Sequence, residues 1–365
     1  MMISCIRSYT VLAAVFATLL STSAAAAATA PRAWLVSKGN TQAVLVGESH
    51  VGTPVENDHY FETVVKPSYA VAEVAVMETY FGPDQLRNGS FALGAPCFDD
   101  PKGLHTQRLH LAFDALIKAT RDSHLDVPNW LESWALVPEY LTLTLLDTFT
   151  TASLGPAYDV VSETGISFRL RGTDTTSKKT IGLDTLGDRR THFCSASAAD
   201  RADFVADKAL QVSRLLRLKQ SDPLYGSLGK LAVVAGEVTD EKVRCVDRPT
   251  PCAIDPVSPG DQILQDKGLE TNYSSGTFEI MIKQRTHAWV PLIAKTISEH
   301  HRTFVIVGAL HLPDLRVGTR VEPGLISLLR QQGFSVTSIC GANDISATFL
   351  SPSWFDRVRS ALGSL

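Results

Sequence analysis

Short apolar runs alternate along this chain with longer stretches in which apolar residues recur at helical spacing. The short runs are rich in β-branched and aliphatic residues and predict strands, at 34–46 (with a turn at 37–40), 69–77, 179–183, 304–307 and 335–339. The longer stretches predict helices, at 57–65, 104–121, 130–149, 198–220, 278–300 and 324–332. Strands that alternate with helices predict an α/β fold, with α+β as the alternative, built on a central mixed sheet flanked by helices.

No composition shift or linker divides the chain after its amino-terminal segment. We therefore expect one domain over 29–365, which is a plausible size for a single core. Two irregular segments rich in Gly, Pro and Asp, 88–103 and 239–262, read as insertions into that domain.

The segment 1–28 has the pattern of a secretory signal peptide. Arg7 precedes an apolar stretch at 11–20, and an alanine-rich segment at 23–28 offers cleavage sites. The stretch is shorter than the roughly 20 residues that a membrane span needs. We expect a periplasmic or secreted protein with no membrane span after cleavage; a retained signal anchor is the alternative.

Five cysteines lie beyond this segment, and an oxidising compartment would favour at least one disulfide. Cys245 and Cys252 flank a short loop-like segment and are the pair we expect. The other pairings cannot be read from the sequence.

The formal net charge of −4 is spread over the chain, without a basic stripe. This argues against nucleic acid as the main partner. We expect a peptide or small-molecule substrate instead.

Two apolar runs end in the same way. Residues 43–46 lead into Gly47 and then His50, and residues 304–307 lead into Gly308 and then His311. The glycine permits a tight turn, so each histidine would lie at the carboxyl end of its strand. Because open α/β sheets place ligand sites at that edge, the two histidines predict one shared site. The repeat also suggests an internal duplication.

A glutamate ends another run in the same fashion. Glu78 follows the strand predicted at 69–77, where a buried carboxylate needs a cation or a metal as partner. His50, His311 and Glu78 together would suit a divalent ion such as Zn, Mn, Fe or Co, which can activate water for hydrolysis. Glu48 would then act as general base or orient His50.

Structural interpretations remain open beside this one. Each histidine taken singly is more often a hydrogen-bonded turn residue, and Glu78 can form a structural ion pair with Arg285 or another arginine. The remaining histidines lie in polar or helical contexts and read as surface residues: His59, His105, His110, His124, His192, His287, His300 and His301.

The carboxy-terminal segments 304–313 (FVIVGALHLP) and 323–336 (PGLISLLRQQGFSV) resemble the TraB/GumN family, which includes the Tiki proteins. The resemblance implies a metal-dependent protease-like site with two Gly-x-x-His motifs and a strand-end glutamate, here at His50, His311 and Glu78. It also implies an arginine in the helix before the second motif, which Arg285 matches.

Two positions depart from the family pattern. Thr286 stands where the family often has an asparagine after the arginine. Asp184 stands where the family usually has the glutamate of a Gly-Leu-Glu-Thr segment, so its side chain is shorter. The first motif is also similar to the start of erythromycin esterases and of haem-binding ChaN-like lipoproteins, which have a related architecture.

Three hypotheses follow. The first is an exported metal-dependent hydrolase that cleaves a peptide or ester bond, with Arg285 orienting Glu78 or holding an anionic intermediate. The second is a non-catalytic protein that binds haem or another small ligand. The third is a metal-independent esterase with His50 as general base.

Overall fold

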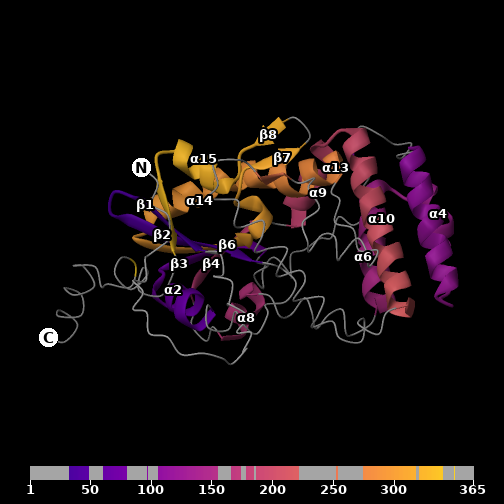
Figure 1. Cartoon of the computed structure of the whole chain (residues 1–365), viewed down its shortest axis with the longest axis horizontal. Helices are drawn as coiled ribbons and strands as arrows, with labels where there is room; N and C mark the ends of the chain where they lie inside the picture. The colour runs from indigo at the N-terminus through magenta and orange to yellow at the C-terminus, as the bar shows by residue number, and fades with distance from the viewer. Residues whose placement is uncertain are drawn as a thin grey trace, which may run out of the picture.

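A six-stranded mixed sheet forms the centre of the computed structural model (Figure 1). The structure describes residues 33–48, 61–79, 97, 106–154, 166–173, 178–184, 186–221, 252–253, 274–317, 320–339 and 349. The sheet order is β4-β3-β6-β2-β1-β9. Its strands are β1 (Ala33–Lys38), β2 (Thr41–Glu48), β3 (Val74–Thr79), β4 (Lys179–Asp184), β6 (Arg302–Gly308) and β9 (Ser335–Ile339).

Strands β4, β3, β6 and β2 are parallel neighbours, and β1 runs antiparallel to both of its neighbours, β2 and β9. The hairpin predicted at 34–46 is confirmed, with Gly39 at a φ of +59° in the turn between β1 and β2. Glycine adopts this left-handed conformation without strain. The mixed α/β architecture predicted from the sequence is therefore confirmed.

Helices cover both faces of the sheet, because alternate residues along each strand point to opposite sides. Val305 and Val307 pack with α14 (Gln284–Glu299) and α15 (Leu325–Gln331) on one face. Phe304 and Ile306 pack on the other face with a π-helical turn, η2 (Phe61–Val65), and with α2 (Lys66–Val71) and α8 (Ile166–Thr173). Figure 1 shows α14 and α15 above the sheet, and α2 and α8 below it.

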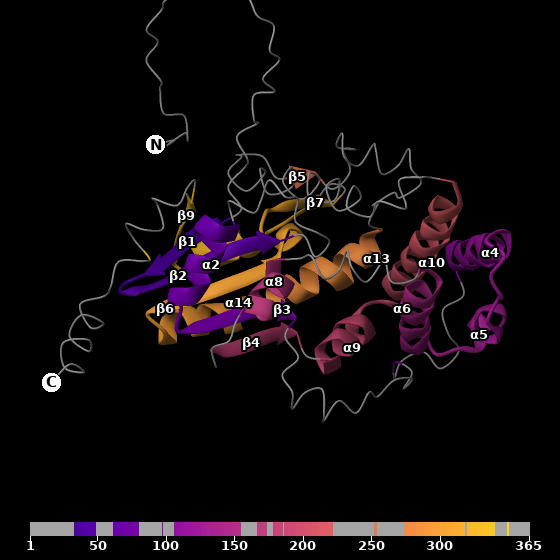
Figure 2. The same cartoon turned by 90° about the horizontal axis from the view of Figure 1, so that it is seen from below.

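Five helices form a second hydrophobic core beyond one end of the sheet (Figure 2). This helical module consists of α4 (Gln107–Asp122), α5 (Asn129–Glu132), α6 (Glu139–Leu154), α9 (Leu186–Ser195) and α10 (Ala198–Ser221). Phe113 and Trp134 stack at 4.4 Å within its core. Short elements α13 (Ser275–Phe278) and η5 (Glu279–Lys283) connect the module to α14.

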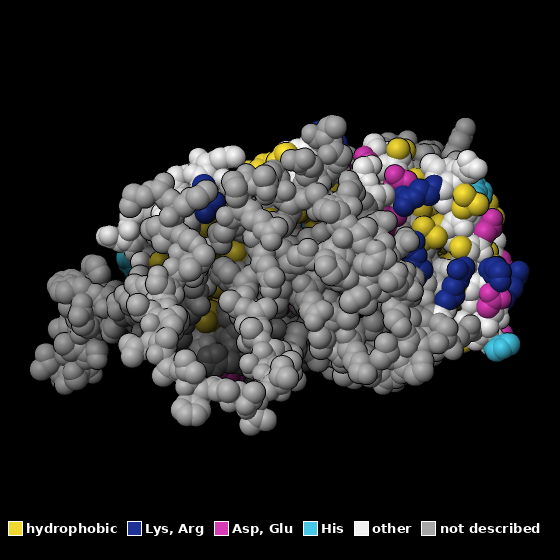
Figure 3. All heavy atoms as spheres, viewed as in Figure 1, with side chains coloured by type: hydrophobic (Ala, Val, Ile, Leu, Met, Phe, Trp, Pro, Cys, Tyr) yellow, Lys and Arg dark blue, Asp and Glu magenta, His cyan; other side chains and the backbone are white. Residues whose placement is uncertain are grey.

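The surface of the helical module carries both signs of charge close together. In Figure 3, Lys and Arg side chains alternate with Asp and Glu over this part of the molecule. Several form ion pairs, such as Arg108 with Asp203 at 3.0 Å and Lys118 with Asp122 at 2.7 Å. Positive and negative side chains therefore offset one another over the described surface of this module.

Several predicted boundaries were wrong. Residues 69–71 belong to α2 and not to a strand, because Pro67 near the start of the segment favours a helical turn. The helix predicted at 130–149 is interrupted between α5 and α6, where a 3₁₀ turn, η3 (Trp134–Leu136), precedes Pro138. Proline cannot donate a helical hydrogen bond, so the chain restarts its helix after it.

Other elements were not predicted. Helix α9 had no strong periodicity, and the loop expected after His311 contains the hairpin of β7 (Leu315–Val317) and β8 (Arg320–Glu322). These strands join β5 (Cys252–Ala253), which is the described part of the insertion predicted at 239–262.

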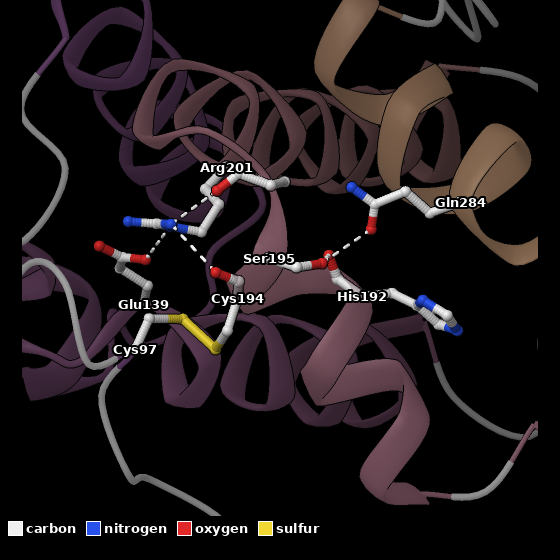
Figure 4. Close-up of a disulfide and its surroundings, with 8 residues drawn as sticks. Cys97, Glu139, His192, Cys194, Ser195, Arg201 and Gln284 are labelled. Carbon is white, nitrogen blue, oxygen red and sulfur yellow. Dashed lines mark hydrogen bonds and ion pairs between the residues drawn. A yellow bond between two sulfur atoms is a disulfide. The ribbon is translucent and has the colours of Figure 1, made fainter. Parts of the chain in front are cut away.

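Cys97 and Cys194 form a disulfide that ties the insertion predicted at 88–103 to the end of α9 (Figure 4). The expected partner of Cys252, Cys245, lies outside the described residues, as does the signal peptide predicted at 1–28. Among the helices that the structure describes, none has the length and hydropathy of a membrane span.

Candidate active site

Polar side chains gather where the parallel strands end. The carboxyl ends of β2, β3, β4 and β6 share one edge of the sheet, which faces the helical module (Figure 2). Glu78, Asp184 and Gly308 lie at this edge, at the ends of β3, β4 and β6. The site predicted at the carboxyl edge therefore has a structural basis in the strand directions.

Arg285 of α14 holds two of these carboxylates. Its Nη2 lies 2.6 Å from Glu78 Oε1 and 2.6 Å from Asp184 Oδ2, and its Nε donates to the same Asp184 oxygen at 2.8 Å. All three side chains are at most 6% exposed. Burial by itself lowers the pKa of Arg285, but the charges of Glu78 and Asp184 outweigh it and raise the pKa. Arg285 is therefore a permanent cation between two carboxylates.

The other oxygen of each carboxylate is also hydrogen-bonded. The backbone N–H of Gly308 donates to Glu78 Oε2 at 2.7 Å, and the indole N–H of Trp289 donates to Asp184 Oδ1 at 2.7 Å. Glu78 thus links strand β3 to the turn that leads to His311, and Asp184 links β4 to α14. Although it is shorter than a glutamate, the Asp184 side chain reaches both of its donors, Arg285 and Trp289. Asp184 is therefore hydrogen-bonded within this cluster despite its departure from the family pattern.

The π-helical turn η5 supplies acceptors to the side chains that follow it. Arg285 Nη1 donates to the carbonyl of Met281 at 3.2 Å, and the hydroxyl of Thr286 donates to the carbonyl of Ile282 at 2.6 Å. Such π turns occur often at functional sites in α-helices. Here the turn fixes the start of α14, from which Arg285, Thr286 and Trp289 reach the sheet edge.

His311 is buried in a 3₁₀ turn, η6 (Ala309–His311), directly after β6. Its Nδ1 lies 2.8 Å from Thr286 Oγ1, and its ring contacts Trp289 with centroids 4.4 Å apart. Because the Thr286 hydroxyl proton is directed to Ile282, its oxygen accepts a hydrogen bond from Nδ1–H. This assigns a proton to Nδ1, so in the neutral ring the lone pair lies on Nε2, the form in which imidazole binds a metal.

Glu48 lies on the opposite face of the sheet from Glu78. It follows Val44 and Val46 on the face that packs against α2 and α8, whereas Glu78 follows Val76 on the face that packs against α14. Its two oxygens accept hydrogen bonds from the Ser167 amide (2.8 Å) and hydroxyl (2.6 Å). The predicted role of Glu48 as base or orienting group stays a prediction.

His50 lies outside the described residues, so the convergence of His50, Glu78 and His311 also stays a prediction. The parallel register sets Glu48 opposite Gly308, which places the two glycines that begin the Gly-x-x-His motifs, Gly47 and Gly308, on adjacent strands. In the described part of the chain, no three His, Cys, Asp or Glu side chains form a metal-binding group.

A cavity of about 290 Å³ opens beside Glu78 and Arg285, between the sheet edge and the helical module. It is lined by residues of α6, α9, α10 and η5. One of them is His192, which the sequence predicted as a surface residue. Burial lowers the pKa of His192, the nearby Asp184 raises it and Arg285 lowers it, with the net result below its ordinary value.

Tyr140 also lines the cavity, and burial raises its pKa. Near pH 7 the phenol is therefore protonated and the His192 imidazole is neutral. Neither residue carried a signal in the sequence, since His192 lies on α9, which the periodicity did not predict. Thr286 was noted only as a departure from the family pattern, and its contact with His311 required the structure.

The fold and this edge define a class: an α/β protein in which a buried arginine pairs two strand-end carboxylates beside a buried strand-end histidine. Comparison with protein families gives a match to the TraB/PrgY/gumN family over residues 261–338. The match spans α14, β6 and α15, including Arg285 and His311, and supports the resemblance to this family that the sequence predicted. No curated protein and no solved structure matches the chain. The relationships to Tiki proteins and erythromycin esterases stay predictions.

Proposed function

We propose that this protein is an exported metal-dependent hydrolase that cleaves a peptide or ester bond at the carboxyl edge of its sheet. The observation that carries the proposal is the contact between His311 Nδ1 and Thr286 Oγ1, which in the neutral ring directs the lone pair of Nε2 away from Thr286. Metal-binding histidines are commonly held in this way through their other ring nitrogen. The adjacent Glu78 offers carboxylate oxygens to the same ion, and His50 would be the third ligand.

The donor set fits a divalent ion such as Zn, Mn, Co or Fe, which accept imidazole and carboxylate ligands together. When bound, such an ion supplies an acidified water and polarises a carbonyl. Glu78 can contribute a further lone pair although both oxygens already accept hydrogen bonds, because an ionised carboxylate has about four acceptor positions.

Arg285 acts as a positioning residue in this proposal. Its Nε and Nη2 contact Asp184 and Glu78, and its Nη1 donates to Met281, so its donors are directed to the protein. This supports the orienting role predicted for Arg285 over a role in holding an anionic intermediate. A guanidinium between two carboxylates fixes the direction of both.

The proposed export is supported by two features. The segment 1–28 has the pattern of a signal peptide. The Cys97–Cys194 disulfide suits an oxidising compartment such as the periplasm or the extracellular space.

Metal analysis tests the proposal directly. The purified mature protein should contain about one equivalent of a divalent metal, and His50→Ala, Glu78→Gln and His311→Ala should each lose it. His301→Ala, whose side chain is exposed, is the matched control and should retain the metal. Hydrolysis of peptide and ester probes should stop with EDTA and return with Mn, Co or Zn.

Other results would contradict the proposal. A metal-free protein whose stability is unchanged by divalent ions would exclude it, and activity that survives EDTA would favour the metal-independent esterase with His50 as base.

A second candidate function is non-catalytic ligand binding. It is favoured by the hydrogen bonds on all four oxygens of Glu78 and Asp184, since such a saturated cluster is typical of a structural support. A Soret band on titration with haem would identify the haem-binding version.

A further inference from the structure

Part of the wall of the cavity beside Glu78 and Arg285 is apolar, and we call this part the apolar section. Its residues come from helices α6, α9 and α10 and from the π-helical turn η5. The side chains that form this section are Leu143, Phe193, Phe204, Ile280 and Met281. All except Met281 are at most 9% exposed, so they belong to the packed core and present a fixed surface to the cavity.

The two ends of the cavity differ in exposure. At the inner end, the Glu78 and Arg285 side chains are 5% and 6% exposed. At the outer end, the Asp147, Arg189 and Lys208 side chains are 74%, 46% and 33% exposed. The cavity lining therefore joins solvent-exposed charged side chains, the apolar section and the buried carboxylate–arginine cluster.

Charges around the cavity balance. Arg285 pairs with Glu78 and Asp184, Arg189 approaches Asp184 at 4.0 Å, and Lys208 approaches Asp147 at 3.9 Å. These three cations face three carboxylates, and His192 is neutral near pH 7 because burial lowers its pKa. A ligand group that packs against the apolar section thus meets no excess of either charge. An ionic group is disfavoured at this section because it would lose water without gaining a partner.

We infer that this cavity is a subsite for one bulky apolar group of the substrate, attached to the carbonyl compound that reacts at the sheet edge. This inference rests on the proposed function for the location of the reacting bond. The cavity volume of about 290 Å³ is small for a ligand pocket. The space suits a phenylalanine- or leucine-sized side chain, or a short acyl chain, rather than an extended polysaccharide.

Binding of uncharged probes tests the subsite without any need for turnover. N-acetyl-phenylalaninamide is compared with N-acetyl-glycinamide, and hexanamide with acetamide, by ligand-observed NMR on the full mature protein. Burial of the extra apolar group should tighten binding of the larger member by about tenfold or more. A preference within the amino-acid pair would identify the apolar group of the substrate as a peptide side chain. A preference within the hexanamide and acetamide pair would identify it as an acyl chain.

A matched pair of variants locates the preference in this cavity. Leu143→Trp should fill the space beside the apolar section and abolish the preference for the larger probe of each pair. Leu111→Trp makes the same change at a position on α4 that is 61% exposed, and should keep it. Met281→Ala enlarges the cavity and should extend the preference to longer chains, which also keeps the test decisive if Leu143→Trp does not fold.

The outcomes separate this inference from the proposed hydrolase. Equal binding of the members of both pairs to the unaltered protein would overturn the subsite, whatever the activity. A preference that persists unchanged in a folded Leu143→Trp protein would overturn it as well. A preference that disappears in Leu143→Trp, in a protein that carries no metal and cleaves nothing, would support the subsite and remove the hydrolase.

Discussion

Thr286 Oγ1 lies 2.8 Å from His311 Nδ1, and the same hydroxyl donates its proton to the carbonyl of Ile282. One threonine therefore sets the tautomer of a buried histidine across the interface between α14 and the end of β6. The family pattern often has asparagine at this position, and an asparagine side-chain carbonyl could accept the same Nδ1–H bond. In this chain the Thr286 hydroxyl is the acceptor for Nδ1–H.

Removal of the Thr286 hydroxyl should allow the His311 proton to move from Nδ1 to Nε2. Thr286→Val keeps the shape but leaves Nδ1 without this acceptor, so we expect about 1–3 kcal/mol of lost stability and about 10–100-fold weaker metal binding. Thr286→Ser should retain both. The ¹⁵N chemical shifts of His311 report the tautomer directly, and an unchanged Nδ1–H tautomer in Thr286→Val would contradict the assignment.

Arg285 is the cation on which two buried carboxylates depend. Arg285→Met should cost about 3–5 kcal/mol in the free energy of unfolding, because it leaves Glu78 and Asp184 buried with no guanidinium. Arg285→Lys should recover only part of this loss, since a lysine lacks the planar fork.

The control for Arg285 is Arg121, whose ion pair with Glu132 is exposed on both sides. Arg121→Met should cost about 0–1 kcal/mol. Urea denaturation measures all three variants, and equal costs at Arg285 and Arg121 would contradict a buried cluster.

The lowered pKa of His192, which lines the cavity, predicts that the stability of the protein depends on pH. Burial lowers the pKa of His192 below its ordinary value of 6.5. A group with a depressed pKa contributes stability above its unfolded pKa and loses it as the pH falls through the folded value. We therefore expect the protein to lose stability below about pH 6.5, and His192→Gln to lose less.

Urea denaturation between pH 5 and 8 compares the two proteins. His301→Gln, at an exposed position, should follow the original protein. Parallel curves for His192→Gln and the original protein would refute the assignment of this loss to His192.

Gly324 borders the turn that follows His311. A Cβ at this position would lie 2.1 Å from the Pro313 carbonyl oxygen and 2.4 Å from that of Leu312, so the backbone itself must move. Gly324→Ala should cost about 3 kcal/mol. At Gly47 the closest atom would be a side-chain methyl of Leu312 at 2.6 Å, which can move more easily, so Gly47→Ala should cost less. Thermal denaturation that ranks them in the reverse order would contradict this view of the turn.

The Cys97–Cys194 disulfide closes a loop with a sequence separation of 97 residues. Replacement of both cysteines by serine should lower stability by about 2–4 kcal/mol. The loss should appear first around α9, where Arg201 donates to the carbonyls of Cys194 and Ala196 and pairs with Glu139 (Figure 4).

Peptide mapping under non-reducing conditions identifies the pairs present. It should recover the peptide that joins Cys97 to Cys194 and also tests the predicted Cys245–Cys252 pair. Free Cys97 and Cys194 thiols in protein purified from an oxidising compartment would contradict the structure.

Strands and long helices were predictable where local patterns are strong. The apolar runs of β2 and β6 and the spacing of α10 follow from the strand and helix periods, which depend only on neighbouring residues. Predicted element boundaries were wrong where a proline changed the local conformation against the apolar pattern, as at Pro67 and Pro138. Helix α9 escaped prediction because its burial comes from packing within the helical module, and not from a clear periodic face.

The sequence by itself determined the α/β class, the resemblance to the TraB/GumN family in its carboxy-terminal part and the ends of strands at which Glu78 and His311 stand, because these depend on local periodicity and short motifs. Only the tertiary structure decided that Arg285 joins Glu78 to Asp184, that Thr286 holds His311 and that His192 lines a cavity. These contacts join segments that are 25 to 207 positions apart along the chain. They depend on strand order and on the packing of α14 and the helical module, which no local pattern specifies.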